Sequence, residues 1–176
     1  MKSSFGRSFS SVAIILLLAL TLLGASFQIL VKNYLTDTMY NTLLSDARIL
    51  ANLASSYSTD GSLTGQEFRL NLNVVGQISD SDSLVVDSTG RIVMCSDVAS
   101  GCDHCGLQIN TDYVQKVIAQ GEDRGEGVLR GMYEDARYVV SVPVMNFEGT
   151  EAQGIIIVST PTTATTSVLN RISNIF

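Results

Sequence analysis

The sequence predicts an α+β protein: an N-terminal transmembrane helix that continues into a long helix, then a five-stranded antiparallel sheet with flanking helices and a C-terminal exit helix. Three observations lead to this class. An uncharged apolar run lies near the N-terminus. A segment without Gly or Pro but with helical spacing of apolar residues follows it. Short runs of β-branched residues separated by turn signals fill the second half of the chain.

The first element is the apolar run Val12–Val31, which is long enough to cross a bilayer core at about 1.5 Å per residue. Lys2 and Arg7 precede it, and beyond position 32 no basic residue occurs until Arg48. This bias predicts a cytoplasmic tail over residues 1–11, a single span over residues 12–31 and export of the remainder across the cell membrane.

A cleaved signal peptide is the alternative interpretation, because Gly24-Ala25-Ser26 supplies small residues near the expected cleavage position. The apolar run is longer than the core of a signal peptide, however, and it continues into a helical pattern without a break. Both features favour an uncleaved anchor.

The exported part is acidic and the size of one domain. The chain has 176 residues, with 11 Lys+Arg against 17 Asp+Glu. Without Lys2 and Arg7, 9 basic residues remain against 17 acidic ones, a formal charge of −8. Such a surface repels nucleic acid and anionic lipid, so we expect no nucleic-acid partner.

Helical patterns come first in the exported part. Apolar residues recur every three or four positions from residue 32 to Tyr57, and Asp60-Gly61 is expected to end this helix. Thr64-Gly65-Gln66-Glu67 has the form of a capping box, which predicts a second helix reaching Ser79. Farther along, Asn110 or Thr111 is expected to cap a short helix that Gly121 ends.

The strand signals lie between and after these helices. We predict strands over Leu84–Val86 and Arg91–Cys95, joined by a tight turn over residues 87–90. A three-stranded meander is expected over residues 127–132, 137–145 and 153–159. Thr160-Pro161 then predicts the cap and first turn of the exit helix.

This order of elements carries a resemblance. It has three parts: the long membrane-proximal helix, the segment Val86-Asp87-Ser88-Thr89-Gly90-Arg91-Ile92-Val93, and Val142-Pro143-Val144 followed by Gly149 and residues 154–159. Together these parts resemble the extracellular PAS-like (Cache, or PDC) sensor domain of bacterial sensor histidine kinases. The resemblance covers Lys32–Thr160. It implies a sensor domain over residues 32–160 outside the cell, and a juxtamembrane helix over residues 161–176 that leads to a second span.

The cysteines cluster between positions 95 and 105, and their spacing admits three readings. Cys95 and Cys102 can form a structural disulfide, since they lie on the exported side where disulfides persist. Cys102-Asp103-His104-Cys105 can be a redox pair, although no buried strand leads into it and no helix follows it directly. Three thiolates with His104 or Asp97 can bind a metal such as Zn²⁺.

The resemblance bears on this choice. Cys95-Ser96-Asp97 followed by Cys102-x-His104 is similar to a loop of clostridial-type histidine kinases, which implies a disulfide between Cys95 and Cys102. Cys105 departs from that pattern.

Candidate ligand-binding residues lie on or beside the meander. Arg130 suits a carboxylate, and Tyr133 and Tyr138 combine apolar surface with a hydroxyl, with Ser141 close by. The competing interpretation is that these side chains face outward on half-exposed strands. The common hydrolase and nucleotide-binding motifs are absent, so we expect no catalytic residues in this segment. We also expect neither a resident metal nor a cofactor, since the structural disulfide is the favoured role of the cysteines.

These observations predict the input region of a two-component sensor histidine kinase, which works as a homodimer and acts on a response regulator through cytoplasmic domains. Two other functions remain open. The chain can be the ligand-binding domain of a methyl-accepting chemotaxis receptor, which shares the architecture. It can also be a membrane-anchored thiol redox protein that uses Cys102 and Cys105.

Overall fold

The structure is a computed structural model that describes residues 4–57, 63, 65–96, 102 and 104–163; of residues 4–8 and 130 only the backbone is described. Three α-helices are present among these residues: α1 (Ser4–Tyr57), α2 (Gln66–Ser79) and α3 (Thr111–Gln120). The strands are β1 (Asp82–Asp87), β2 (Ile92–Cys95), β3 (Asp123–Gly127), β4 (Arg137–Met145) and β5 (Ala152–Pro161), with a 3₁₀ turn over Leu129–Gly131.

The five strands form one sheet in the order β2-β1-β5-β4-β3, and every neighbouring pair is antiparallel. The long strands β4 and β5 make its centre, with Val140 opposite Val158 and Ser141 opposite Ile157. Gly154 lets β5 approach β1 closely, since a Cβ at this position would overlap the carbonyl oxygen of Val86. The predicted α+β sheet of five antiparallel strands is confirmed.

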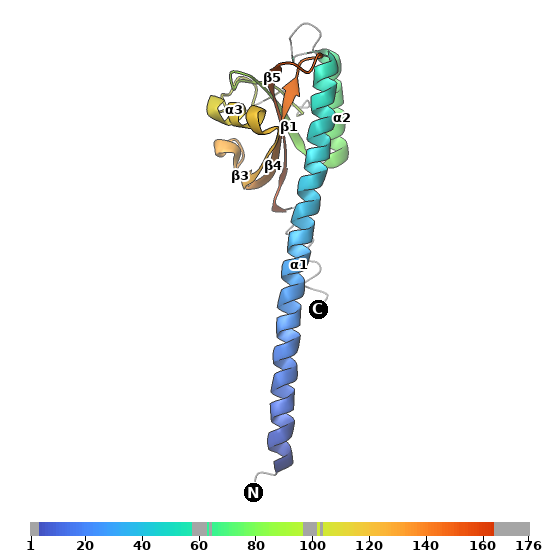
Figure 1. Cartoon of the computed structure of the whole chain (residues 1–176), viewed down its shortest axis with the longest axis vertical. Coiled ribbons are helices and arrows are strands. Elements are labelled where there is room, and N and C mark those ends of the chain that lie inside the picture. The colour runs from blue at the N-terminus through green and yellow to red at the C-terminus, as the bar shows by residue number, and fades with distance from the viewer. Residues whose placement is uncertain (1–3, 58–62, 64, 97–101, 103, 164–176) are drawn as a thin grey trace. The chain divides into compact units, whose positions relative to one another are not determined.

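Both faces of the sheet are covered, so the side chains on both faces of a strand are buried. On one face α1 and α2 pack against Val140 and Ile156, and on the other α3 packs against Ile155 and Ile157 (Figure 1). Alternation of side chains along a strand separates these two core clusters. The β-branched run in β5 therefore supplies both of them.

Helix α1 belongs to two compact units, which divide between Asp37 and Thr38. In the second unit its buried face, which includes Leu43, Ala47 and Leu50, packs into the core. The described part of α1 from Phe9 on is also the one helix, among the described residues, that is long and apolar enough to cross a membrane.

Several predicted elements are confirmed. The hairpin of β1 and β2 turns at Asp87–Gly90, where the Asp87 carboxylate accepts hydrogen bonds from the backbone of Thr89 and Arg91. Asn110 is the N-cap of α3, since its side chain accepts from the N–H of Asp112. Gly121 ends that helix with a φ of 81°.

The expected capping box of α2 is wrong. The N-cap is Gly65, one residue later than Thr64, and it makes no side-chain capping hydrogen bond. Asp80 closes the other end of α2 in the left-handed conformation. Thr64 itself, and the expected helix end at Asp60-Gly61, lie outside the described residues.

The first strand of the meander is also misplaced. It runs over Asp123–Gly127 rather than residues 127–132, and the segment after it turns at Leu129, where φ is 45°. Val128 and Leu129 looked like strand residues because they are apolar. Leu129 instead packs against the core cluster beside α3, and the low β-propensity of Asp123–Gly127 is overridden by pairing with β4.

Thr160 and Pro161 do not begin a helix. They are the last residues of β5, opposite Tyr138 and Arg137. The ladder with β1 ends at Ser159, so Pro161 has β4 as its one partner strand. On the side where β1 has ended, the missing N–H of Pro161 costs no ladder bond. The remainder of the expected exit helix, residues 164–176, lies outside the described residues.

Candidate functional site

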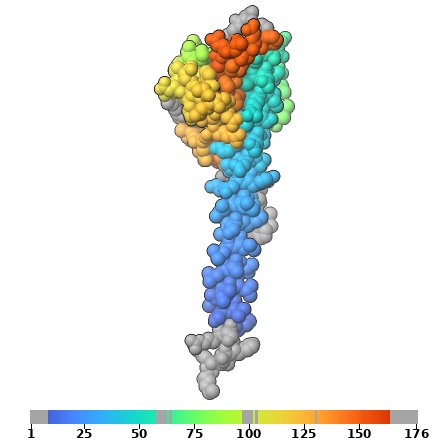
Figure 2. Space-filling model, in the orientation of Figure 1, coloured from blue at the N-terminus to red at the C-terminus, as the bar shows by residue number. Residues whose placement is uncertain are grey.

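A cavity of about 670 Å³ opens on the α3 side of the sheet. Its walls come from α3, from β3 and β4, from the 3₁₀ turn and from the segment before α3. Helix α3 lies at the surface beside it (yellow in Figure 2). The lining residues are His104, Leu107, Gln108, Ile109, Tyr113, Asp123, Gly125, Glu126, Gly127, Leu129, Gly131, Met132 and Val139. The mixture of apolar side chains with a few polar groups is typical of a small-molecule site.

Strand β3 provides the open wall of this cavity. Asp123, Gly125 and Gly127 alternate onto one face, opposite Ser141, Val139 and Arg137 of β4. A Cβ at Gly125 or Gly127 would meet no atom within 4 Å. These two glycines therefore leave space that any other residue would occupy. The sequence analysis placed the first strand of the meander only from residue 127 on, so it missed this role.

The polar groups of the cavity form a small network. The Tyr113 hydroxyl lies 2.8 Å from the Ser141 hydroxyl, and the Lys116 ammonium donates to the Asp123 carboxylate at 2.7 Å. Burial raises the pKa of Tyr113, the hydrogen bond with Ser141 partly offsets this, and Asp123 adds to the rise. Tyr113 therefore stays a neutral hydroxyl at physiological pH. A cavity of this kind offers hydrogen bonds as well as a carboxylate.

The reverse face of the same strands meets α1. Tyr138 is buried in β4 and packs edge-on against Tyr40 of α1, with ring centroids 5.3 Å apart. Arg48 of α1 forms an ion pair with Glu122 just before β3, at 2.9 Å. Strands β3 and β4 are thus a shared wall, with the cavity on one side and α1 on the other.

A stack of side chains leads from the cavity to the end of β5. The ring of His104, which lines the cavity, lies 5.1 Å from the ring of Tyr133. The Arg137 guanidinium lies over the Tyr133 ring, 4.1 Å from its centroid. Burial, with the nearby Asp82 carboxylate, raises the pKa of Tyr133 to about 12.

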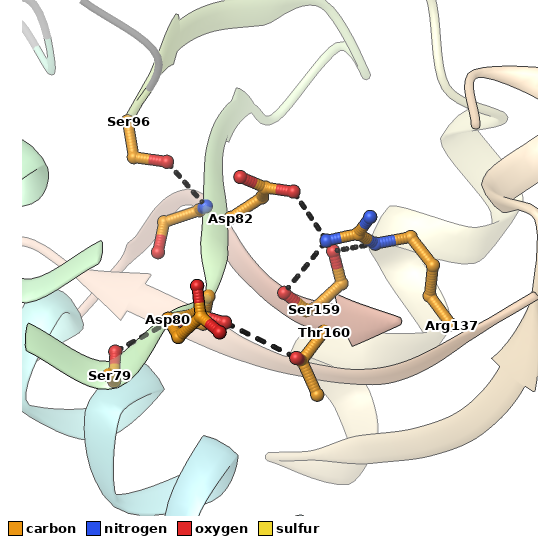
Figure 3. Close-up of polar contacts among 9 residues, drawn as sticks. Ser79, Asp80, Asp82, Ser96, Arg137, Ser159 and Thr160 are labelled. Atoms are coloured by element: carbon orange, nitrogen blue, oxygen red, sulfur yellow. Dashed lines mark hydrogen bonds and ion pairs between the residues drawn. The ribbon is translucent and has the colours of Figure 1, made fainter. Parts of the chain in front are cut away.

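The Arg137 side chain ends this stack. It is buried, and its guanidinium donates to the Ser159 hydroxyl at 3.0 Å, to the Ser159 carbonyl at 3.3 Å and to the Asp82 carboxylate (Figure 3). Nearby, the Thr160 hydroxyl donates to the Asp80 carbonyl at 3.2 Å. The end of β5 is therefore joined to β1, β4 and the C-terminus of α2 by side-chain hydrogen bonds.

The cysteine pairing differs from the expected one. The disulfide joins Cys102 to Cys105, and not Cys95 to Cys102. A turn in which the Cys105 N–H donates to the Cys102 carbonyl brings their Cα atoms within 5.2 Å. Cys95, the last residue of β2, is buried in the core beside α3. The two bonded cysteines are close in sequence, so the turn geometry alone favours their pairing.

The four predicted ligand residues do not come together. Arg130 lies in the 3₁₀ turn between two cavity-lining residues, and Tyr133 follows it in the stack described above. Ser141 reaches the cavity network through Tyr113. Tyr138 lies on the opposite face of β4, against α1. A role for these residues in ligand binding stays a prediction.

Sequence reasoning missed most of the lining residues. Tyr113, Asp123 and Gln108 come from segments that meet only in the folded sheet. The usable signal was the alternation of Asp123, Gly125 and Gly127, which places two glycines on one strand face. It was hidden because this strand was expected four residues later.

Comparison with known proteins gives matches among solved structures alone. No protein-family model matches the chain, and no curated protein matches it.

The structural matches are sensor domains. The Escherichia coli DcuS sensor domain has a TM-score of 0.58 at 17% identity, over 77% of this chain and 97% of that domain. The Vibrio cholerae histidine kinase DctB sensor domain has a TM-score of 0.53 at 15% identity, over 79% and 58%. The ligand-binding domain of the Campylobacter jejuni chemoreceptor Tlp3, in complex with 4-methylisoleucine, has a TM-score of 0.61 at 14% identity, over 78% and 56%.

These likenesses define the fold. The domain has the Cache (PDC)-like fold of extracellular sensor domains, which occurs in both histidine kinases and chemoreceptors. The expected PAS-like sensor fold is confirmed, whereas the clostridial part of the resemblance has no support. The chain spans a little more than half the length of the DctB and Tlp3 domains.

Proposed function

We propose that this chain is the membrane-anchored, extracytoplasmic input region of a two-component sensor histidine kinase, and that it senses a small molecule bound in the cavity beside α3. The observation that carries the proposal is the shared wall: β3 and β4 line the cavity with one face and contact α1 with the other. In this arrangement residues 1–11 are cytoplasmic, residues 12–31 span the membrane and residues 32–160 form the sensor. The segment over residues 161–176 would lead back to the membrane.

The mechanism follows from that wall. A ligand that draws β3 toward α3 moves Glu122, and with it the ion pair to Arg48 of α1. A ligand seated against His104 also acts on Tyr133 and Arg137, and so on the end of β5. Binding changes the signalling state only if it favours one of two arrangements of these elements. Shifts of about 1–2 Å in helices are the usual size of such a switch.

The proposed homodimer has a candidate surface on α2. Leu70, Val74 and Ile78 are spaced four residues apart and are exposed. They lie on the side of α2 that does not face the core, and a second copy of the chain would cover them. Sedimentation of the full chain with Leu70→Ser, Val74→Ser and Ile78→Ser tests this, since a dimer through α2 should become a monomer.

Ligand binding is tested with the full chain in detergent micelles. The Tlp3 domain has been solved with L-valine and L-norvaline, so a panel of amino acids and short carboxylic acids is a suitable start. Calorimetric titration should reveal a binder, and Gly125→Val, which fills the cavity, should abolish its binding. Gly65→Val is the matched control, because a Cβ at Gly65 also meets no atom within 4 Å and lies outside the cavity. A ligand that binds Gly125→Val as tightly as the parent chain would contradict the proposed site.

A chemotaxis receptor is the second candidate, favoured by the similarity to the Tlp3 domain. Incubation of the full-length protein with ATP separates the two. Phosphorylation of a histidine in the cytoplasmic part supports the kinase, whereas ligand-dependent methylation of glutamates with no phosphorylation supports the receptor.

A further inference from the structure

The three cysteine sulfurs lie close together, although they come from two separate segments of the chain. The Sγ atoms of Cys95, Cys102 and Cys105 are all within 4.8 Å of one another. Cys95 is buried at the end of β2, Cys102 is half-buried and Cys105 is exposed. The cluster is thus supported from the core and accessible from solvent.

Backbone hydrogen bonds also hold the cysteine turn against β2. The Gly106 N–H donates to the Ile92 carbonyl at 2.8 Å, and the Ile92 N–H donates to the Leu107 carbonyl at 3.0 Å. Two further backbone hydrogen bonds close the turn: the Cys105 N–H donates to the Cys102 carbonyl, and the Leu107 N–H donates to the His104 carbonyl. These hydrogen bonds do not involve the sulfurs, so we expect the three sulfurs to stay near one another when the disulfide is opened.

We propose that Cys95, Cys102 and Cys105 form a reduction-dependent site for a soft d¹⁰ metal ion such as Zn²⁺ or Cd²⁺. In the structure the site is closed by the Cys102–Cys105 bond. A dithiol reductant transfers two electrons and two protons to that bond, gives two thiols and is itself oxidised to a disulfide. The metal ion then displaces the thiol protons to solvent and binds three thiolates.

The donor set determines the class of ion. Thiolates select zinc, copper(I) and similar soft ions over magnesium or calcium, which require oxygen ligands. Three protein sulfurs leave the fourth tetrahedral position open to water. This inference concerns the sulfur cluster alone and does not depend on the proposed ligand cavity.

The test uses the full chain in detergent micelles and Cd²⁺ as the probe. The protein is reduced with a phosphine, desalted without oxygen and titrated, while the ultraviolet thiolate-to-cadmium charge-transfer band is followed. We expect about one Cd²⁺ per reduced chain. The oxidised chain, which has the same sequence, is the matched control and should give no band.

Two variants test the ligand set. Cys95→Ser should weaken binding by at least about tenfold, since even the loss of a ligand's outer hydrogen-bond partner costs that much. Cys105→Ser should weaken it similarly, and because Cys105 is exposed this variant keeps the test valid if Cys95→Ser fails to fold. Absence of the band in the reduced chain, or equal binding by folded variants and parent, would overturn the proposal.

Discussion

Asp46 is a carboxylate in an unfavourable place. It lies in α1, and its Oδ2 atom is buried and accepts no hydrogen bond among the described residues. Burial raises its pKa, and the nearby Ser79 hydroxyl offsets part of this rise. The folded domain therefore binds the Asp46 proton more tightly than the unfolded chain does, and the charged carboxylate weakens the fold at neutral pH.

Asp46→Asn should accordingly stabilise the domain at pH 7, because it removes a charge that burial disfavours. The stability that Asp46 lends in its protonated form is complete below about pH 3.9, the unfolded value, and is lost as the pH rises through the folded pKa. The gain from the substitution should thus shrink toward pH 3.9. Thermal unfolding across this range measures it, with the exposed Glu148→Gln as control. A variant less stable than the parent at pH 7 would refute the argument.

Arg137 is the residue that fastens the end of β5. Arg137→Met should lower the free energy of unfolding by about 2 kcal/mol, because it removes charge-assisted hydrogen bonds to Ser159 and Asp82 while half-exposed Asp82 is hydrated instead. Arg137→Lys should rescue only part of this loss, since an ammonium cannot reproduce the planar fork. Urea unfolding of Arg137→Met, of Asp82→Asn and of the double variant measures the coupling, and Arg137→Lys is unfolded beside them. Strictly additive losses would show that the ion pair contributes nothing.

At the scale of elements, the sheet depends on close contact between β1 and β5. Predicting β4 and the β1–β2 hairpin was possible from local signals, because each has β-branched residues and a turn of known chemistry. Strand β3 was not predictable in this way. Its residues have poor strand propensity, and only the free edge of β4 makes them extended. The cavity wall was therefore not predicted from strand propensity.

Gly154→Ala should destabilise the domain by about 1–3 kcal/mol, since the added methyl group would overlap the Val86 carbonyl and force β1 and β5 apart. Gly125→Ala is the matched control, a strand glycine whose Cβ meets no atom within 4 Å. It should change stability by less than about 1 kcal/mol. Chemical denaturation of the two variants compares them directly. Equal effects would show that the approach of β5 to β1 is not limiting.

At the scale of the whole molecule, the compact unit that begins at Thr38 contains all the sheet and both core clusters. It should fold without the preceding apolar segment. A chain starting at Thr38 should remain in solution and unfold cooperatively, whereas the full chain should sediment with membranes and require detergent for release. Far-ultraviolet circular dichroism and membrane fractionation measure the two properties. Release of the full chain by high salt alone would contradict a spanning helix.

The sequence by itself determined the local features of this protein: the apolar N-terminal helix, the Asp87–Gly90 turn, the cap and stop of α3, and an α+β domain with five antiparallel strands. Each depends on residues near one another in the chain. Tertiary structure alone decided the place of β3, the end of β5 at Pro161 and the residues around the cavity. These depend on which strand edge or side chain is nearest in space, and distant segments meet only when the core forms.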